Sequence, residues 1–190
     1  MDVTTWYLEQ TSPADLRPGR PPAIPAQVVR AEVPSPEFSR FLYTAVGGDW
    51  QWTERLEWTW RQWKEWLDLP GVETWVAWVR GTPAGYVELV SREGEVEIVY
   101  FGLLPFAIGQ GLGGWLLGEG VARAWDMAER RPGLKPTRRV WVHTCSLDGP
   151  AALANYKARG FRIYDEKLNV PGDGDEGETP GPWPGAGPRD

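Results

Sequence analysis

The sequence of 190 residues is poor in the side chains that build cross-links and metal centres, with one Cys, one His and two Met. A single Cys excludes a disulfide framework within the chain, and one Cys with one His excludes a multi-ligand zinc site. No run approaches the roughly 18 consecutive apolar residues of a membrane span. The N-terminal stretch MDVTTWYLEQ lacks the charged start and apolar run of a signal peptide. We therefore expect a cytoplasmic protein without a metal.

The balance of charge is acidic, because 20 Lys and Arg face 26 Asp and Glu. A nucleic-acid binder normally shows a basic footprint, so we expect no nucleic acid as partner. Since no run is long and apolar enough to span a bilayer, we expect no membrane as partner either. Proline and glycine divide the chain. Residues 1–26 read as an N-terminal extension with an edge strand near Thr5–Leu8 and a Pro-rich connector. Residues 27–170 form the predicted domain, and residues 171–190, rich in Pro, Gly and acids, read as a disordered tail.

The order of the predicted elements indicates an α+β protein with a mixed sheet. After a strand at 27–33, a helix is expected from Pro36 to about Ala45, and a second from an N-cap at Thr53 to the stop at Pro70 and Gly71. Three strands joined by short turns should be antiparallel. The expected later elements are a helix at 111–130, a strand at 139–144, a helix from Pro150 to Gly160 and a strand at 161–164.

A glycine-rich turn, Gly109–Gly114, separates the third of those strands from the long helix. Backbone N–H groups at such a turn, together with the positive end of the helix dipole, favour a phosphate. A Rossmann-type nucleotide binder is one alternative, although the antiparallel strands before the turn argue against it. A tight connection with no ligand is the other.

Two motifs resemble those of the GNAT superfamily, the GCN5-related N-acetyltransferases. The segment Ile108–Gly113 is similar to the family's Q/R-x-x-G-x-G/A signature, and Asn155–Phe161 (NYKARGF) resembles its Y-x-x-x-G-F ending. Two positions depart from the family pattern: Ile108 replaces Gln or Arg, and Gly149 stands where many members have Asn. The resemblance implies a mixed, mostly antiparallel twisted sheet flanked by helices on both faces.

The resemblance also implies an acetyl-CoA-dependent N-acetyltransferase that transfers an acetyl group to a primary amine by direct attack. Backbone N–H groups of Leu103 and Leu104 would polarise the thioester, and Gln110 would partly replace the missing side chain at 108. The residues that the resemblance assigns to acetyl-CoA are Leu103, Leu104, Gly109, Gln110, Gly111, Leu112, Gly113, Gly114 and Asn155.

Catalytic groups are expected around the same turn. Tyr156 matches the family's general acid, since a Tyr is protonated at neutral pH and can donate to a thiolate. Glu97 lies where many relatives place a base, and Glu88 on the preceding strand competes for that role. His143, the only His, is a further candidate to touch the substrate. For each of these four residues the alternative is an ordinary structural role.

Eight of the 13 tryptophans lie between Trp50 and Trp78. Helical spacing predicts one broad aromatic face formed by Trp52, Leu56, Trp60, Trp63 and Leu67. This face either packs on the sheet as core or helps to wall the acceptor pocket. In the second case Trp58 or Trp66 would offer a cation–π contact to an amine.

Two functional classes therefore stay open. The first is the N-acetyltransferase, with a small-molecule or peptide amine as acceptor, acting as a monomer or homodimer. The second is a module of the same fold that binds acyl-CoA or a protein without turnover. A basic cluster between the long helix and its next strand is expected to be a solvated loop, with an adenosine phosphate as the alternative ligand: Arg130, Arg131, Lys135, Arg138 and Arg139.

Overall fold

The structure is a computed structural model that describes residues 3–50 and 52–169, so the tail predicted at 171–190 lies outside the described residues. Its strands are β1 (Val3–Gln10), β2 (Gln27–Arg30), β3 (Val72–Val79), β4 (Thr82–Arg92), β5 (Glu95–Leu103), β6 (Arg139–Cys145) and β7 (Arg162–Asn169). Its helices are α1 (Pro36–Gly47), α2 (Trp60–Leu67), α3 (Leu112–Trp125), α4 (Met127–Arg130) and α5 (Ala152–Ala158), with short 3-10 turns η1 (Pro13–Asp15), η2 (Gly48–Trp50) and η3 (Pro105–Ala107).

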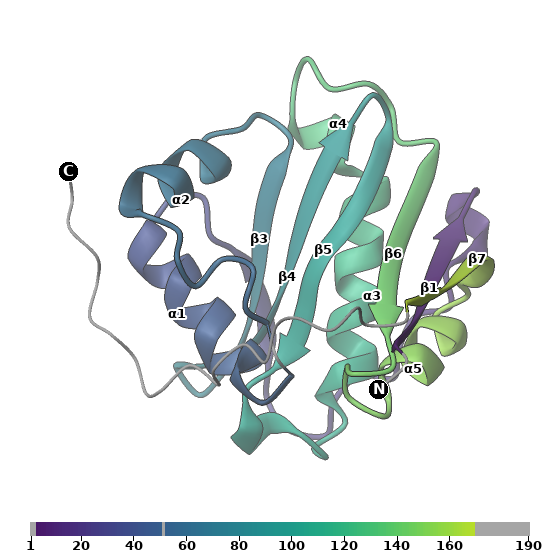
Figure 1. The fold of residues 1–190 in the computed structure, drawn as a ribbon, viewed down its shortest axis with the longest axis horizontal. Helices are drawn as coiled ribbons and strands as arrows, with labels where there is room; N and C mark the ends of the chain where they lie inside the picture. The colour runs from purple at the N-terminus through teal and green to yellow at the C-terminus, as the bar shows by residue number, and fades with distance from the viewer. Residues whose placement is uncertain (1–2, 51, 170–190) are drawn as a thin grey trace.

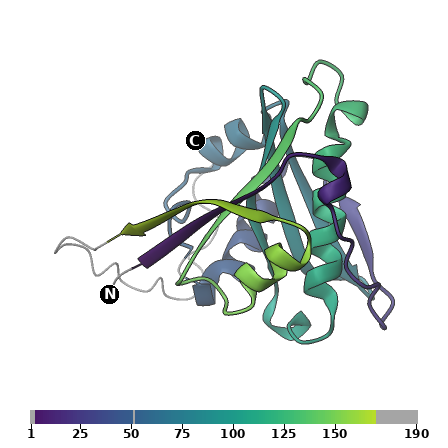
Figure 2. The same ribbon diagram turned by 90° about the vertical axis from the view of Figure 1, so that its right-hand side faces the viewer.

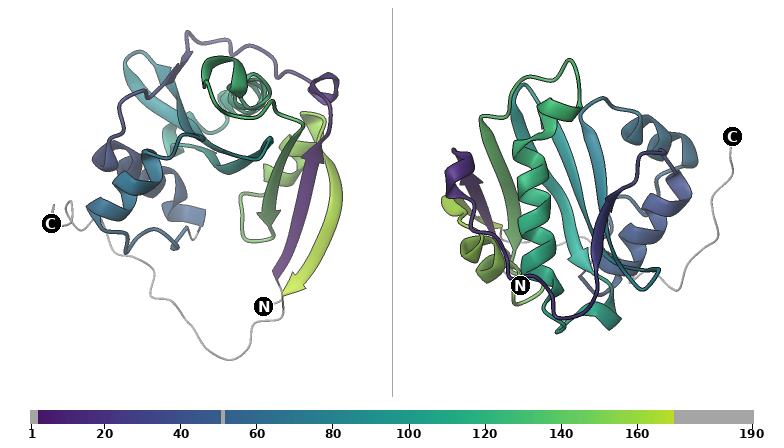
Figure 3. Two further views of the ribbon diagram at one scale, coloured as in Figure 1. Left: turned by 90° about the horizontal axis from the view of Figure 1, so that it is seen from above. Right: turned by 180° about the vertical axis from the view of Figure 1, so that it is seen from behind.

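The strands form one seven-stranded sheet in the order β2-β3-β4-β5-β6-β1-β7. Neighbouring strands are antiparallel except β5 and β6, which run parallel. Helices α1 and α2 cover one face of the β3–β5 half, and α3 crosses the other face, with α5 beside it (Figures 1 and 3). The expected α+β class, with a mixed and mostly antiparallel sheet between helices, is confirmed. No helix among the described residues is both long and apolar enough to cross a bilayer.

The main core lies between α3 and the sheet. Leu116, Leu117 and Val121 of α3 are fully buried and pack in one cluster with Val87 and Ile98 of the central strands. A smaller cluster under α1 joins Leu42 and Val46 to Val76 and Tyr86. Burial of such side chains contributes roughly 1.5–3 kcal/mol each. These two clusters hold the sheet between its helix layers.

The N-terminal strand occupies a different place from the one predicted. β1 pairs with β6 on one side and β7 on the other, so it is an interior strand and not an edge strand. Figure 2 shows β1 and β7 side by side. The connector that follows crosses the back of α3 (Figure 3, right), where a Cβ on Gly19 would lie 2.2 Å from the Gly114 carbonyl oxygen. Only glycine permits this close approach of two backbones.

Helix α2 begins later than the sequence predicted. Its N-cap is Thr59, which forms a reciprocal capping box with Gln62, and Thr53 lies in the preceding turns. Trp52 and Leu56 are therefore not on this helix, and the predicted aromatic face shrinks to Trp60, Trp63 and Leu67. Other boundaries differ as well. The long helix ends at Trp125 before the short α4, and α5 begins at Ala152, two residues after Pro150. The strand expected at 27–33 ends at Arg30, and the one expected at 161–164 runs on to Asn169.

The parallel strands β5 and β6 pair only at their first residues, Glu95–Glu97 opposite Arg139–Trp141. Beyond that point they separate, and the β6–β1–β7 half of the sheet turns away from the other half (Figure 3, left). The register between β4 and β5 also shifts after Glu88, which marks a bulge on β5. A gap between β5 and β6 therefore opens toward the glycine turn.

Candidate active site

The end of β5 presents backbone donors to this gap. Leu104 donates its N–H to the carbonyl of Ala84 at 2.9 Å, so it is not available to polarise a thioester, contrary to the expectation. Hydrogen-bonded and non-hydrogen-bonded pairs alternate in antiparallel strands. Leu104 and Ala84 form a hydrogen-bonded pair, and Leu103 and Phe101 occupy the alternate positions along β5. Their N–H groups therefore point away from β4 and toward the gap. Leu103 therefore remains a candidate donor, and Phe101 is a second candidate that the sequence reasoning missed.

The glycine turn lies directly below the gap and opens α3. Gly109 and Gly111 have φ angles of 82° and 76°, a left-handed conformation that favours glycine. Gly111 is the N-cap of α3, and no heavy atom lies within 4 Å of a Cβ built on either residue. The buried side chain of Leu112 anchors the turn to the core. The first N–H groups of α3 have no partner within the helix, and the open space at Gly109 and Gly111 directly precedes them, as a phosphate site requires.

The side chains around the turn are arranged differently from the prediction. Gln110 donates its side-chain amide to the Phe106 carbonyl at 2.5 Å and so folds back on its own loop. Ile108 is 53% exposed and has no polar group to donate. The Gln110 amide therefore does not replace the Gln or Arg side chain that the family signature has at position 108.

The C-terminal motif approaches the turn from α5. The Asn155 amide lies 3.6 and 3.8 Å from Cβ atoms built on Gly114 and Gly113, so the predicted neighbourhood of Asn155 and the turn exists. Arg159 lies closer still, with its guanidinium 2.5 Å from the Cβ position of Gly114. Sequence reasoning missed Arg159, although it directly precedes the Gly160 of the motif.

Tyr156 is buried on the α3 side of the sheet, where its ring contacts Phe101 at 6.1 Å and Phe161 at 6.0 Å between centroids. Burial raises the pKa of the Tyr156 hydroxyl above its usual 10.0, and nearby Asp148 raises it further. Its hydroxyl is therefore protonated at neutral pH and can act as a donor.

Glu97 lies on the opposite face of the sheet from Tyr156. It pairs with Val90, which packs with Leu67 of α2, and this places its carboxylate on the α1–α2 side. Its Oε1 lies 3.7 Å from Nδ1 of His143, across the point where β5 and β6 separate. Burial raises the pKa of Glu97, and the nearby His143 partly counteracts that rise. The structure thus brings two predicted residues together at the mouth of the gap.

Glu88, the competing base, is committed to another partner. Its carboxylate accepts from Arg55 Nη1 at 2.8 and 3.2 Å and from the Trp66 indole at 3.0 Å, and both Glu88 and Arg55 are buried. Burial raises the pKa of Glu88, while the Arg55 guanidinium counteracts the rise. Glu88 is therefore a structural ion pair and is not positioned as a free base.

The cation that the tryptophans hold is the guanidinium of Arg55. This group lies 4.5 Å from the ring centroids of Trp58 and Trp66, and 4.6 Å from that of Tyr100. Trp63 completes this arrangement at 5.5 Å. The rings predicted to hold a substrate amine thus enclose a side chain of the chain itself. Nothing in the spacing of the tryptophans indicated Arg55.

The second departure from the family pattern, Gly149, lies against Trp50. Ring atoms of Trp50 lie 3.5–3.7 Å from a Cβ built on Gly149, in ordinary van der Waals contact. The loop after β6 and the 3-10 turn after α1 therefore meet at this point. An indole therefore occupies the space beside Gly149.

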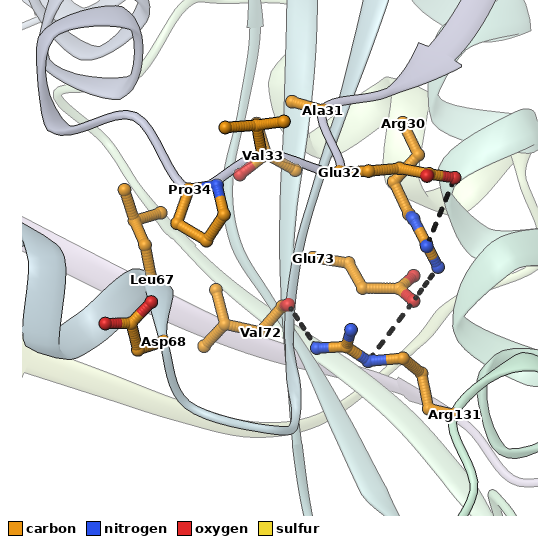
Figure 4. A pocket seen from close by; sticks show the side chains of 11 residues that line it. Arg30, Ala31, Glu32, Val33, Pro34, Leu67, Asp68, Val72, Glu73 and Arg131 are labelled. Atoms are coloured by element: carbon orange, nitrogen blue, oxygen red, sulfur yellow. Dashed lines mark hydrogen bonds and ion pairs between the residues drawn. The ribbon is translucent and has the colours of Figure 1, made fainter.

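The basic cluster lies at the opposite end of α3 from the turn and is neutralised by carboxylates. Arg130 donates to buried Glu73 at 2.7 Å, while Arg30 and Arg131 lie 3.2 and 3.9 Å from the same carboxylate, in the hollow of Figure 4. Lys135 pairs with Glu93, and both Arg138 and Arg139 pair with Glu95. These contacts do not support a grip on an adenosine phosphate.

The sequence matches the model of the Acetyltransferase (GNAT) family over residues 35–161. No curated protein matches it. Among solved structures, a GCN5-related N-acetyltransferase from Kribbella flavida has 19% identity and a TM-score of 0.57, covering 89% of this chain and 58% of its own. One from Sphaerobacter thermophilus has 16% identity and a TM-score of 0.59, covering 87% and 50%. The chain therefore spans 58% of the first structure and 50% of the second.

A third similar structure is the ribosomal-protein-S18-alanine N-acetyltransferase from Escherichia coli. It has 14% identity and a TM-score of 0.52, and the alignment covers 73% of this chain and 78% of that one. At such identities these neighbours establish the fold alone. The family match covers well over half of the chain and includes the glycine turn and the C-terminal motif. The chain belongs to the GNAT family of acetyltransferases.

Proposed function

We propose that the protein transfers an acetyl group from acetyl-CoA to a primary amine on a small molecule or peptide. The observation that carries this proposal is the gap between β5 and β6, with the open glycine turn at its base. Acetyl-CoA fits these residues because Gly109 and Gly111 leave space for a phosphate and α3 offers N–H groups to it. Bound there, acetyl-CoA would supply the activated acyl group.

Backbone groups would orient the donor. The Gly109–Gly114 turn and the start of α3 would hold the pyrophosphate, with Arg159 adding positive charge nearby. The N–H groups of Phe101 and Leu103 point into the gap and would polarise a carbonyl placed there. The polarising donors are therefore part of β5 itself.

Two side chains would move protons on opposite faces of the sheet. On the α1–α2 face, Glu97 would accept a proton from the acceptor ammonium, and His143 lies beside it at 3.7 Å. On the α3 face, buried Tyr156 stays protonated and would donate to the leaving sulfur. This separation lets the base and the acid act without neutralising each other.

The alternative, a module that binds acyl-CoA without turnover, is favoured by Ile108, which removes a side-chain donor from the family signature. One experiment separates the two. Isothermal titration calorimetry should detect acetyl-CoA binding, and a thiol-release assay with a panel of primary amines should detect CoA. Binding without release for any amine would favour the module, and absence of binding at millimolar acetyl-CoA would reject both.

A further inference from the structure

A second group of rings lies beside Glu97, on the face of the sheet that also carries its carboxylate. Trp141 stands directly opposite Glu97 in the parallel register, and Tyr7 stands opposite His143 on the neighbouring strand. The ring centroids of Trp141 and His143 are 6.3 Å apart, those of His143 and Tyr7 5.9 Å, and those of Tyr7 and Tyr164 6.2 Å. We name these four residues, from β6, β1 and β7, the ring row.

The ring row includes two exposed members, whereas the tryptophans around Arg55 are half-buried (Trp58 and Trp66) or fully buried (Trp63). The His143 side chain is 47% exposed and Tyr164 is 42% exposed, while Tyr7 and Trp141 are half-buried. Figure 1 shows α1 and α2 over the other half of this face, with no helix of the described residues in front of β6 and β1. An acceptor can therefore approach Glu97 from solvent along the ring row.

Charged side chains of both signs flank the row. Glu97 lies at its inner end, and Arg139 lies 5.9 Å from the Trp141 centroid and 4.6 Å from that of Tyr164. At the outer end Lys167 lies 4.9 Å from the Tyr7 centroid, and Asp165 stands directly opposite Tyr7 on β7. Arg139 also pairs with Glu9 and Glu95. Among the described residues, no ion pair of Lys167 accompanies its contact with Tyr7. Because Asp165, Glu9 and Glu95 accompany these cations, the row offers an acceptor its rings rather than a net charge.

We propose that the acceptor is an arylalkylamine, a primary amine joined by a short alkyl chain to an uncharged aromatic ring. Its ammonium would lie at Glu97 and its ring against Tyr7 and Trp141. Aromatic pairs add attraction beyond the area that they bury, so a ring gains more from this row than an alkyl chain does. This inference rests on the proposed acetyl transfer and specifies its acceptor.

Steady-state CoA release with tryptamine, n-octylamine and spermidine tests the proposal. We expect kcat/KM for tryptamine to exceed that for n-octylamine by about tenfold, the effect of one good aromatic contact, and also to exceed that for spermidine, which has no ring. An equal or higher value for n-octylamine or spermidine would overturn the arylalkylamine but leave acetyl transfer intact. Absence of CoA release with every amine would count against acetyl transfer itself.

Substitutions then locate the preference. Tyr7→Leu and Tyr164→Leu should each lower the tryptamine to n-octylamine ratio several-fold, while Phe41→Leu, at an exposed ring on α1, should leave the ratio unchanged. Since β1 is an interior strand, thermal unfolding checks that Tyr7→Leu folds, and Tyr164→Leu at the exposed end provides the second variant. A ratio that survives both substitutions contradicts the proposal.

A readout that needs no turnover completes the test. Calorimetric titration of tryptamine into the protein with saturating CoA should show tighter binding than n-octylamine, and Tyr7→Leu should remove the difference. Equal affinities for the two amines in the unsubstituted protein would reject the ring row as the acceptor site.

Discussion

Glu97 and His143 face each other across the opening between β5 and β6, with Oε1 and Nδ1 3.7 Å apart. The two residues come from strands that the chain joins only through α3 and α4, yet they meet where the parallel pairing ends. A carboxylate and an imidazole at this point can share the handling of one proton. The pH dependence of activity in variants of each residue separates the contributions of Glu97 and His143.

Glu97→Gln should lower kcat/KM by about 100-fold or more, because the amine loses its proton acceptor. Burial raises the pKa of Glu97 above its ordinary 4.5, so activity of the unsubstituted enzyme should fall on acidification with an inflection above that value. Since His143 lowers the pKa of Glu97, His143→Gln should move the acid limb to higher pH. A pH profile that is identical in the two proteins would remove His143 from this role.

Tyr156→Phe should lower kcat by about 100-fold while changing acetyl-CoA affinity by less than about threefold, because only the proton donor is lost. Burial raises the pKa of the hydroxyl above 10.0, so no alkaline limb due to Tyr156 should appear below pH 10. Rapid-quench kinetics and calorimetry give the two quantities. Equal kcat for the two proteins would exclude Tyr156 as the acid.

Glu88→Gln should destabilise the protein by about 3–5 kcal/mol, since it leaves the buried Arg55 guanidinium without its carboxylate. Urea unfolding followed by tryptophan fluorescence measures this change. Glu54→Gln is the matched control, because Glu54 accepts from the Tyr100 hydroxyl at an exposed position and should cost about 1 kcal/mol or less. A stable Glu88→Gln protein with greatly reduced turnover would return Glu88 to consideration as the base.

Gly111→Ala should weaken acetyl-CoA binding at least tenfold, because the strained turn would shift its N–H groups. Gly133 is the control: its φ is 94°, it also has open space around a Cβ, and it lies in the loop after α4. Both substitutions should cost about 1–2 kcal/mol of stability from backbone strain. Only Gly111→Ala should change the calorimetric affinity for acetyl-CoA. An equal loss of affinity in Gly133→Ala would mean that lower stability of the whole domain, and not the glycine turn, weakens binding.

Ile108→Arg should raise acetyl-CoA affinity about threefold to tenfold, because it restores a charged donor beside the phosphate turn. The exposed position of Ile108 lets the longer side chain enter without disturbing the core. Ile108→Leu keeps the apolar character and should bind as the original does. If the Arg protein binds no better, the phosphates do not pass Ile108.

The elements nearest to the turn could be predicted because their signals are local. Glycines at 109 and 111, the strand before them and the apolar helix after them lie within one stretch of sequence. Helix α2 shows how a local signal can be misjudged: Thr53 and Thr59 both suit an N-cap, but only Thr59 has a Gln three residues later to complete a capping box.

Other parts of the site depend on contacts between distant segments. The sequence does not show that Arg55 pairs with Glu88, because a buried ion pair between a loop and a strand leaves no periodic trace. For the same reason it did not reveal the row of Tyr7, His143 and Tyr164, whose strands lie at opposite ends of the chain. The interior position of β1 was missed for this reason too.

That position of β1 has a consequence for how the protein is made. Among the described elements β1 is synthesised before all others, whereas both of its partners, β6 and β7, are synthesised only after α4. It must therefore wait, unpaired, until nearly the whole described chain has been translated, and such long-range pairings form slowly. During that interval Val3–Gln10 is an exposed strand with no edge to join, and a chaperone has its longest opportunity to bind there.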